Sequence, residues 1–239
     1  MKHALVTGGT GDIGAAICAE LGRAGHHVVV HTHRRPDRAQ EIAAKIRDDG
    51  GSAEAVAFDV VDAAATAAAL ELLLARAPIQ ILVNNAGVTA DAPLAGMSQA
   101  QWHGVVDVVL NGFFNVTQPL LLPMIRTRWG RVVNIASVSA LSGNRGQANY
   151  AAAKAGLIAA GKSLAIEVAR RGVTVNSVAP GIIATPMAEA AFDAETIKRL
   201  VPMERAGTAL EVAQLVAFLA SDAAAYISGQ CISINGAIY

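Results

Sequence analysis

The sequence predicts an α/β protein with a doubly wound parallel sheet of about seven strands and helices on both faces. Short, β-branched apolar runs alternate with alanine-rich segments of helical length along all 239 residues. Most of the runs are continuously apolar, which is typical of strands buried on both faces. A glycine-rich stretch follows the first run. Strand–helix alternation along the whole chain favours a parallel sheet covered by helices.

Seven short runs rich in valine, isoleucine and alanine have the length of strands: residues 3–7, 27–32, 53–58, 79–84, 131–136, 173–178 and 231–234. Six longer segments lie between them and have the length of helices: residues 13–24, 37–49, 62–76, 98–122, 149–170 and 208–221. We expect one domain over residues 1–239, because no linker, repeat or low-complexity segment interrupts this order. The irregular segment at about 180–205 contains three prolines. Long loops inside compact domains are usually functional, and we expect a lid over residues 182–203.

Composition excludes several classes of function. Nineteen basic residues balance nineteen acidic ones, so the excess of Lys and Arg that a nucleic-acid surface needs is missing. No run of about 18 apolar residues is free of charges and breakers, and the start of the chain lacks a signal-peptide pattern. We therefore expect a cytoplasmic protein without a membrane span. Cys18 and Cys231 form no CxxC pair, so we interpret them as buried thiols and predict no metal site.

The stretch TGGTGDIG, residues 7–14, lies at the first predicted strand-to-helix junction. Glycines permit a tight turn and close approach of the backbone to a diphosphate, and a helix N-terminus supplies N–H groups. Gly8, Gly11 and Gly14 give the spacing TGxxGxxG, which favours a dinucleotide cofactor over an ordinary turn. Asp12 begins the helix, and we expect its carboxylate to cap backbone N–H groups while pointing outward.

The residues after the second predicted strand indicate which dinucleotide binds. A carboxylate at this point would bind the adenosine ribose hydroxyls of NAD. The stretch VVVHTHRRPDR has no acid before Arg34 and Arg35. Guanidinium groups suit a 2′-phosphate, so we predict NADPH. A solvated basic turn is the alternative interpretation, and His33 is either a further phosphate ligand or a surface residue.

Three residues form a candidate catalytic group: Ser137, Tyr150 and Lys154. Tyr150 and Lys154 lie four residues apart, on one face of a predicted helix, and Ser137 follows a predicted strand. Carbonyl reduction needs an acid that protonates the developing alkoxide. Because the pKa of free tyrosine is about 10, we expect the Lys154 ammonium to bring the pKa of Tyr150 closer to neutrality. We expect the Ser137 hydroxyl to bind the substrate oxygen. A YxxxK spacing alone fits a pair of residues on a helix surface equally well. The glycine loop on the first strand favours the catalytic interpretation.

With these motifs in place, the chain resembles the short-chain dehydrogenase/reductase family over essentially all of its residues, which implies a Rossmann-type fold. The resemblance rests on TGGTGDIG at 7–14, FDV at 58–60, NNAG at 84–87, Ser137, YAAAK at 150–154 and PGIIATPM at 180–187. It implies contacts between the cofactor and Gly8, Thr10, Gly11, Asp12, Ile13, Gly14, Arg34, Arg35, Asp59, Val60, Asn85, Ala86, Gly87, Tyr150, Lys154, Pro180, Gly181, Ile183 and Thr185.

Within the family, the stretches at 146–181 and 216–236 are most similar to those of bacterial 3-oxoacyl-[acyl-carrier-protein] reductases. The resemblance implies reduction of a 3-keto thioester with NADPH. It also implies docking of an acidic carrier protein at Arg128 and Arg171. Helices 98–122 and 149–170 are more apolar than one sheet face requires, so we expect a homotetramer, or at least a dimer.

Several positions depart from the family pattern. Asp12 stands where a glycine is usual, and Gly11 replaces the basic residue of many NADPH enzymes. The family's catalytic Asn, which by resemblance holds a water linking Lys154 to solvent, is replaced by Val109. Asn111 lies about 200° further around the helix and is not a substitute. Pro186 and the NGA at 235–237 are expected to have minor effects.

Two alternatives therefore stay open. One is the same chemistry on another ketone or alcohol, because this fold serves many substrates. The other is a weakly active cofactor-binding subunit of a hetero-oligomer with a related reductase, which Val109 favours and the intact Ser137, Tyr150 and Lys154 oppose. Neither the acyl chain length nor the pathway follows from the sequence.

Overall fold

The computed structural model describes residues 1–186 and 192–239 and contains one sheet of seven parallel strands. The strand order is β3-β2-β1-β4-β5-β6-β7, and every neighbouring pair is parallel. The strands are β1 (His3–Val6), β2 (His27–Thr32), β3 (Ser52–Ala57), β4 (Ile79–Asn84), β5 (Gly130–Ile135), β6 (Val173–Pro180) and β7 (Cys231–Ile234). The predicted doubly wound parallel fold is confirmed.

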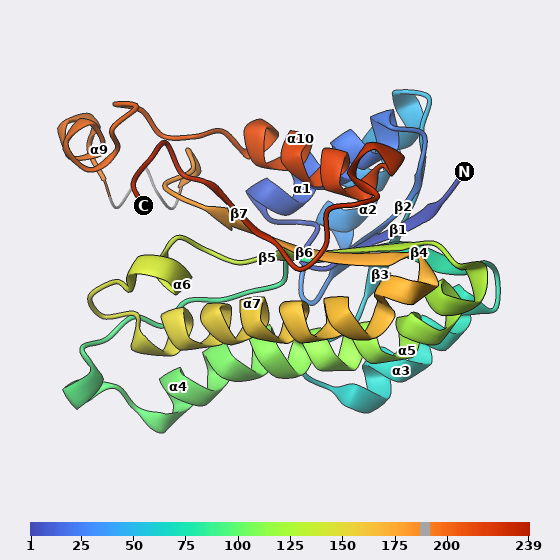
Figure 1. Ribbon diagram of the computed structural model, residues 1–239, viewed down its shortest axis with the longest axis horizontal. Helices are drawn as coiled ribbons and strands as arrows, with labels where there is room; N and C mark the ends of the chain where they lie inside the picture. Colours follow the sequence, from blue (N-terminus) through green and yellow to red (C-terminus); the bar gives the residue numbers. More distant parts are fainter. Residues whose placement is uncertain (187–191) are drawn as a thin grey trace.

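Helices cover both faces of the sheet (Figure 1). One layer consists of α1 (Asp12–Arg23), α2 (Pro36–Asp48) and α10 (Ala209–Ala220). The opposite layer consists of α3 (Ala63–Leu74), α4 (Gln99–Val106), α5 (Gly112–Thr127) and α7 (Ala148–Val168). Shorter helices are η1 (Leu94–Gly96), η2 (Asp107–Asn111), α6 (Ser139–Ser142), η3 (Ala169–Arg171), α9 (Ala194–Leu200) and η4 (Asp222–Ala224).

The core is divided into two main clusters, one on each face of the sheet. Neighbouring residues of β2 illustrate the division: Val28 and Val30 pack with α1 and α10, whereas Val29 packs with α5 and α7. All three side chains are fully buried. Because side chains alternate between faces along a strand, burial of both faces requires a continuous apolar run. This is the physical reason that the strands could be predicted from their composition.

The predicted helix 98–122 is in fact three helical pieces that continue to Thr127. A π-helical turn, Asp107–Asn111, separates α4 from α5, and α5 contains two internal prolines. The irregular segment at 180–205 is also more ordered than expected, because β6 reaches Pro180 and α9 lies within it. Part of the lid expected at 182–203, residues 187–191, lies outside the described residues.

The helical segment Gln99–Thr127 is long and apolar enough to span a membrane by length and composition, although the sequence criteria predicted no span. A core helix of a globular protein passes the same test. In this structure the segment packs against α7, α3 and β4. These contacts bury about 33% of its apolar stretch, and side chains such as Phe114 and Leu122 stay exposed.

Candidate active site

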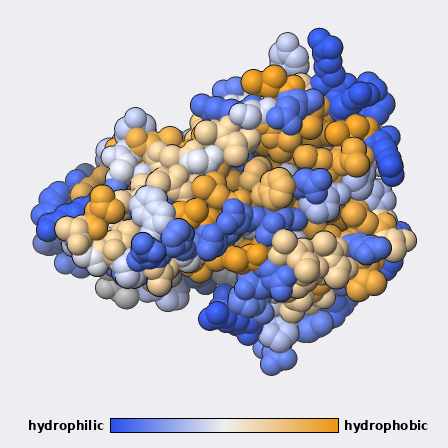
Figure 2. Space-filling view, turned by 90° about the horizontal axis from the view of Figure 1, so that it is seen from below, coloured by the Kyte–Doolittle hydropathy of each residue, from blue (hydrophilic) through white to orange (hydrophobic). Residues whose placement is uncertain are grey.

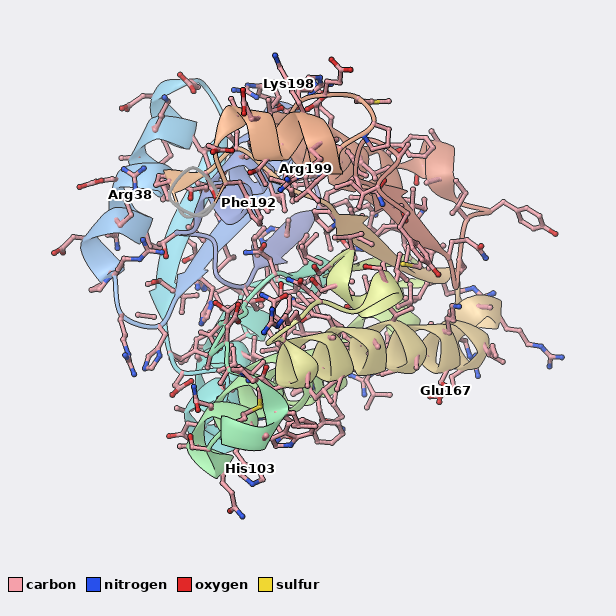
Figure 3. All side chains as sticks on the ribbon, turned by 90° about the vertical axis from the view of Figure 1, so that its left-hand side faces the viewer. Arg38, His103, Glu167, Phe192, Lys198 and Arg199 are labelled. Atoms are coloured by element: carbon pink, nitrogen blue, oxygen red, sulfur yellow. The ribbon has the colours of Figure 1, made fainter. Side chains whose placement is uncertain are left out.

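A cleft of about 770 Å³ lies at the carboxyl edge of the sheet, where β1 separates β2 from β4. This is the edge where the strand order reverses, and doubly wound folds bind their ligands there. Figure 3 views the molecule from this side, with Lys198 and Arg199 of α9 at the top, Arg38 of α2 at one side and His103 of α4 at the bottom. Fourteen predicted cofactor residues line the cleft: Gly8, Thr10, Gly11, Asp12, Ile13, Gly14, Arg34, Arg35, Asp59, Val60, Asn85, Ala86, Gly87 and Thr185.

Close backbone packing explains two of the three loop glycines. Gly8 has a φ of +62°, and a Cβ on Gly14 would lie 2.3 Å from the Gly8 carbonyl oxygen. No side chain fits at Gly14 without moving the loop. A Cβ on Gly11 would meet nothing closer than 3.6 Å, so packing does not demand glycine there. The loop thus keeps its backbone close to the N-terminus of α1, where folds of this kind bind a diphosphate.

Asp12 does not cap the helix, and this prediction was wrong. Gly11 is the N-cap of α1, Asp12 is the first helical residue, and no side chain forms a cap hydrogen bond at this helix end. No hydrogen bond of the Asp12 carboxylate is found among the described residues, and the side chain is exposed, as expected. A carboxylate in the first turn still interacts favourably with the helix dipole.

The end of β2 carries the predicted phosphate-binding residues at the rim of the cleft. Arg34 and Arg35 are exposed, and neither guanidinium has an ion-pair partner in residues 1–186 and 192–239. The Thr32 hydroxyl accepts the Arg35 backbone N–H at 3.2 Å and thereby fixes the turn. His33 is also exposed, with Nε2 3.6 Å from an Asp59 carboxylate oxygen.

Polar contacts join the ends of β1 and β4 beneath the cleft. The Asn85 amide nitrogen donates to the carbonyl oxygens of Thr7 and Gly8, both at 3.0 Å. The Thr7 hydroxyl accepts the backbone N–H groups of Asn85 and Ala86, also at 3.0 Å. Sequence reasoning missed Thr7 as a functional candidate, although its place at the start of TGGTGDIG was a usable signal.

The structure brings Ser137, Tyr150 and Lys154 together. Ser137 follows β5 and hydrogen-bonds the Tyr150 side chain. The Ser139 backbone N–H donates to the Ser137 Oγ at 3.1 Å and holds this hydroxyl in place. Lys154 is 3% exposed, and its Nζ donates to the Ile135 carbonyl at 2.6 Å. The same Nζ lies 5.7 Å from the centre of the Tyr150 ring.

The pKa of Tyr150 differs from the expectation. Burial raises the pKa of Tyr150, the Ser137 hydrogen bond lowers it, and the charge of Asp91 raises it further. Burial also lowers the pKa of Lys154 to about 8. Desolvation therefore outweighs the expected influence of the ammonium in this structure. The Tyr150 phenol holds its proton at neutral pH, which is the state that a general acid requires.

Val109 lies in the π-helical turn and is 3% exposed. It packs against Val105, Ala153 and Leu157, with Tyr150 at the margin of the same cluster. Asn111 is exposed, and its side-chain nitrogen donates to an Asp107 carboxylate oxygen at 2.8 Å. An apolar contact thus replaces the polar side chain that the family places beside the catalytic residues.

The end of β6 closes the other side of the site. Pro180 is its last residue, and its carbonyl accepts the Val138 N–H at 2.8 Å, next to Ser137. Gly181 packs so closely that a Cβ would lie 2.7 Å from that of Asn235. Ile183 is 6% exposed and belongs to the core. These three residues, with Tyr150 and Lys154, stand outside the lining of the cleft itself.

The NGA sequence has a larger structural consequence than expected. Ala237 has a φ of +68°, in the left-handed region that favours glycine. This conformation costs a non-glycine residue roughly 1–2 kcal/mol. The Asn235 side chain accepts the Ala237 N–H at 3.1 Å and helps to hold the turn. The family's usual second glycine is therefore explained by the backbone, and the alanine stores strain.

Arg128 and Arg171 lie far from the catalytic residues. The two turns that carry them pack together, because a Cβ on Gly172 would lie 2.3 Å from the Arg128 carbonyl oxygen. Both side chains are exposed. Tyr150 lies in the first turn of α7, whose 21 residues span about 30 Å, and Arg171 follows its end (Figure 1). The arginines stand at the opposite edge of the sheet from the cleft.

The fold and the site define a dinucleotide-dependent oxidoreductase of the α/β class. A model of the short chain dehydrogenase family matches residues 2–196, and the chain belongs to that family.

Among similar proteins is an acetoacetyl-CoA reductase of Acinetobacter sp. (strain RA3849), 42% identical over 245 residues, with 100% of this chain and 98% of that protein covered. The 3-oxoacyl-[acyl-carrier-protein] reductases FabG of Pseudomonas aeruginosa and Escherichia coli K12 are each 43% identical, with 100% of this chain and 97% of each protein covered.

Proposed function

We propose that this chain is an NADPH-dependent reductase that converts a 3-oxoacyl thioester on an acyl carrier protein to the 3-hydroxyacyl product. The observation that carries the proposal is the grouping of half-buried Ser137 and Tyr150 with buried Lys154 beside a dinucleotide cleft. Full-length similarity to 3-oxoacyl-[acyl-carrier-protein] reductases supports the substrate class. We further propose that residues 1–239 form one cytoplasmic domain, which the single seven-stranded sheet supports.

In the proposed mechanism, bound NADPH supplies the hydride that reduces the carbonyl carbon. Tyr150 donates its phenolic proton to the carbonyl oxygen as negative charge develops there. Ser137 donates a hydrogen bond to the same oxygen and orients it, while the Ser139 N–H holds the Ser137 hydroxyl in place. Lys154 binds the nicotinamide ribose and stabilises the phenolate that remains. Asp59 and Val60 hold the adenine, and Pro180, Gly181, Ile183 and Thr185 hold the nicotinamide end.

The preference for NADPH rests on the unpaired Arg34 and Arg35 at the cleft rim and on the missing acid after β2. A charge-assisted contact contributes roughly 1.5–3 kcal/mol, or about 10- to 100-fold in affinity. Arg34→Ala should weaken NADPH by this factor and leave NADH nearly unchanged. Arg38→Ala is the matched control, because Arg38 pairs with Glu41 on the outer side of α2. Equal losses for both cofactors would show that Arg34 does not bind the 2′-phosphate.

We propose that the carrier protein docks at Arg128 and Arg171, which are exposed at the opposite edge of the sheet from Tyr150. Charge reversal, Arg128→Glu with Arg171→Glu, should raise KM for a carrier-bound 3-oxoacyl substrate and leave KM for the corresponding free thioester unchanged. An equal KM for the carrier-bound substrate in variant and wild type would exclude this docking site.

We propose a homotetramer, built on apolar side chains that one subunit leaves exposed. Phe114 and Leu122 on α5 and Ile166 on α7 are 62%, 61% and 82% exposed. Figure 2 shows hydrophobic residues spread over the face seen from below, on the side of these helices. Light scattering at micromolar concentration should give a mass well above 24.5 kDa. A monomeric mass would refute the homotetramer. A larger mass that appears only when a related reductase is added would favour the hetero-oligomer.

A second candidate is reduction of a coenzyme A thioester, which the similarity to an acetoacetyl-CoA reductase favours. The same catalytic residues would serve both substrates. Three substrates distinguish the candidates: the same 3-oxoacyl group bound to carrier protein, that group bound to coenzyme A, and a simple ketone. The quantity compared is kcat/KM for each substrate. The highest value on the simple ketone would refute both thioester proposals.

A further inference from the structure

His31 is the one fully buried histidine of the cleft wall, with 1% exposure. It lies on β2, the strand between β1 and β3, and its partner in the register with β3 is Val56. The preceding residue, Val30, pairs with Val6, the last residue of β1. The ring is therefore placed where the first and third strands leave the sheet to form the loops that line the cleft.

The His31 ring contacts both of these loops. Its Nδ1 accepts the Gly8 backbone N–H at 3.1 Å, and its Nε2 lies 3.0 Å from the Phe58 carbonyl oxygen. The ring also packs on the Phe58 ring, with centroids 4.1 Å apart. Gly8 belongs to the glycine loop, and Phe58 directly precedes Asp59 and Val60. One side chain thus joins the two segments assigned to the two ends of the adenosine diphosphate.

These two partners leave one protonation state for the ring. A backbone N–H can only donate, so Nδ1 is unprotonated, and a carbonyl can only accept, so Nε2 carries the proton. This is the neutral Nε2–H tautomer. Burial lowers the pKa of His31 to about 4, although the hydrogen bond that the ring donates to the Phe58 carbonyl acts in the opposite direction, so the ring stays neutral around pH 7.

We infer that His31 is a positioning residue for cofactor binding, which holds the glycine loop and residues 58–60 at the spacing that the dinucleotide requires. The inference rests on the proposed function, because it assumes that the cleft binds NADPH. Backbone bonds on the same strand support it: His31 O accepts the Gly9 N–H at 2.8 Å, and the Phe58 N–H donates to Thr32 O at 3.1 Å. A preformed cleft binds more tightly, since less ordering accompanies binding.

The test compares two substitutions of different chemistry. His31→Phe keeps a ring but removes both hydrogen bonds and leaves the Gly8 N–H unpaired. His31→Asn retains an acceptor in the place of Nδ1. Loss of the acceptor of a buried N–H changes an equilibrium constant by about 5- to 150-fold. We expect His31→Phe to raise the Kd for NADPH within this range and His31→Asn to restore most of the affinity.

The readout is the Kd from NADPH fluorescence, together with kcat at saturating NADPH and a thermal melt. A positioning role predicts a higher Kd and KM for NADPH with kcat within about three-fold of wild type. His26→Asn, at the opposite end of β2, is the control and should change neither Kd nor kcat. A Kd unchanged in His31→Phe, with only the melting temperature lowered, would refute the inference. A wild type that does not bind NADPH would refute the proposed function as well.

A measurement on the wild type does not depend on the folding of a variant. Long-range ¹H–¹⁵N correlation spectra should contain one histidine with an unprotonated Nδ1 and a protonated Nε2 that keeps this tautomer when NADPH is added. Its assignment to His31 is made from the signal lost in His31→Asn. A protonated Nδ1 in His31 would overturn the inference.

Discussion

Substitution of Val109 by Asn tests how this chain works without the family's polar residue at that position. The substitution should keep or raise kcat, because by family resemblance an Asn here holds a water that links Lys154 to solvent. It should also destabilise the protein. Val109 is 3% exposed and packs with Val105, Ala153 and Leu157, with Tyr150 at the margin of this cluster.

The size of the destabilisation follows from this packing. Loss of a buried valine and burial of an amide without partners together cost about 2–5 kcal/mol. For a chain of this size, 1 kcal/mol corresponds to about 2–4 °C in Tm, so we expect a decrease of about 5–20 °C. If the introduced amide binds a water that links Lys154 to solvent, the decrease in Tm falls at the lower end of that range.

The assay measures NADPH oxidation with a short 3-oxoacyl thioester alongside thermal melts. Val105→Asn is the matched control, because Val105 is fully buried in the same cluster one turn earlier. It should lower Tm by a similar amount without raising kcat. A folded Val109→Asn enzyme with kcat reduced ten-fold or more would refute the relay reasoning. Rescue of an inactive wild type by Val109→Asn would favour the weakly active subunit.

Three other predictions follow from the local geometry. Ala237→Gly removes a left-handed alanine and should raise the unfolding free energy by about 1 kcal/mol in denaturant melts, and a decrease would contradict the assigned strain. Gly14→Ala should abolish NADPH binding in a fluorescence titration, whereas Gly11→Ala should retain it; equal affinities would contradict the role of the glycine loop. The pKa of Lys154, about 8, lies below the 10.5 of the unfolded chain, so stability rises between those pH values. Relative to Lys154→Met, the unfolding free energy of wild type should rise by up to about 3 kcal/mol from pH 7 to pH 10. An unchanged difference between the two proteins would contradict the burial of the Lys154 ammonium.

The positions of the strands, and the residues at their carboxyl ends, could be predicted from the sequence. The inner strands β2, β4, β5 and β6 are buried on both faces, so their apolar runs predict their positions to within one or two residues. The π-helical turn at Asp107–Asn111 could not be predicted, because apolar residues continue through it without a breaker. The short helix α9 has no buried residue and so carries no periodic apolar signal.

Features that depend on distant residues were the ones that sequence reasoning missed. The pKa of Tyr150 is set by burial and by neighbours from other elements, so the i,i+4 spacing to Lys154 alone gave the wrong direction. His31 has its partners 23 and 27 residues away, and nothing in the pattern VVVHTHRR distinguishes it from His33. Only the register of three strands shows which histidine faces the glycine loop.

The most direct test of the account is turnover of a short 3-oxoacyl thioester by wild type and Tyr150→Phe, with Tyr226→Phe as a control. Tyr226 is fully exposed and outside the site, so its variant should match wild type. The account predicts that wild type oxidises NADPH with this substrate. Tyr150→Phe should lose about 10²- to 10⁴-fold in kcat while its Kd for NADPH stays the same, because the phenol is needed for proton delivery. A Tyr150→Phe enzyme that turns over at the wild-type rate would contradict the catalytic assignment.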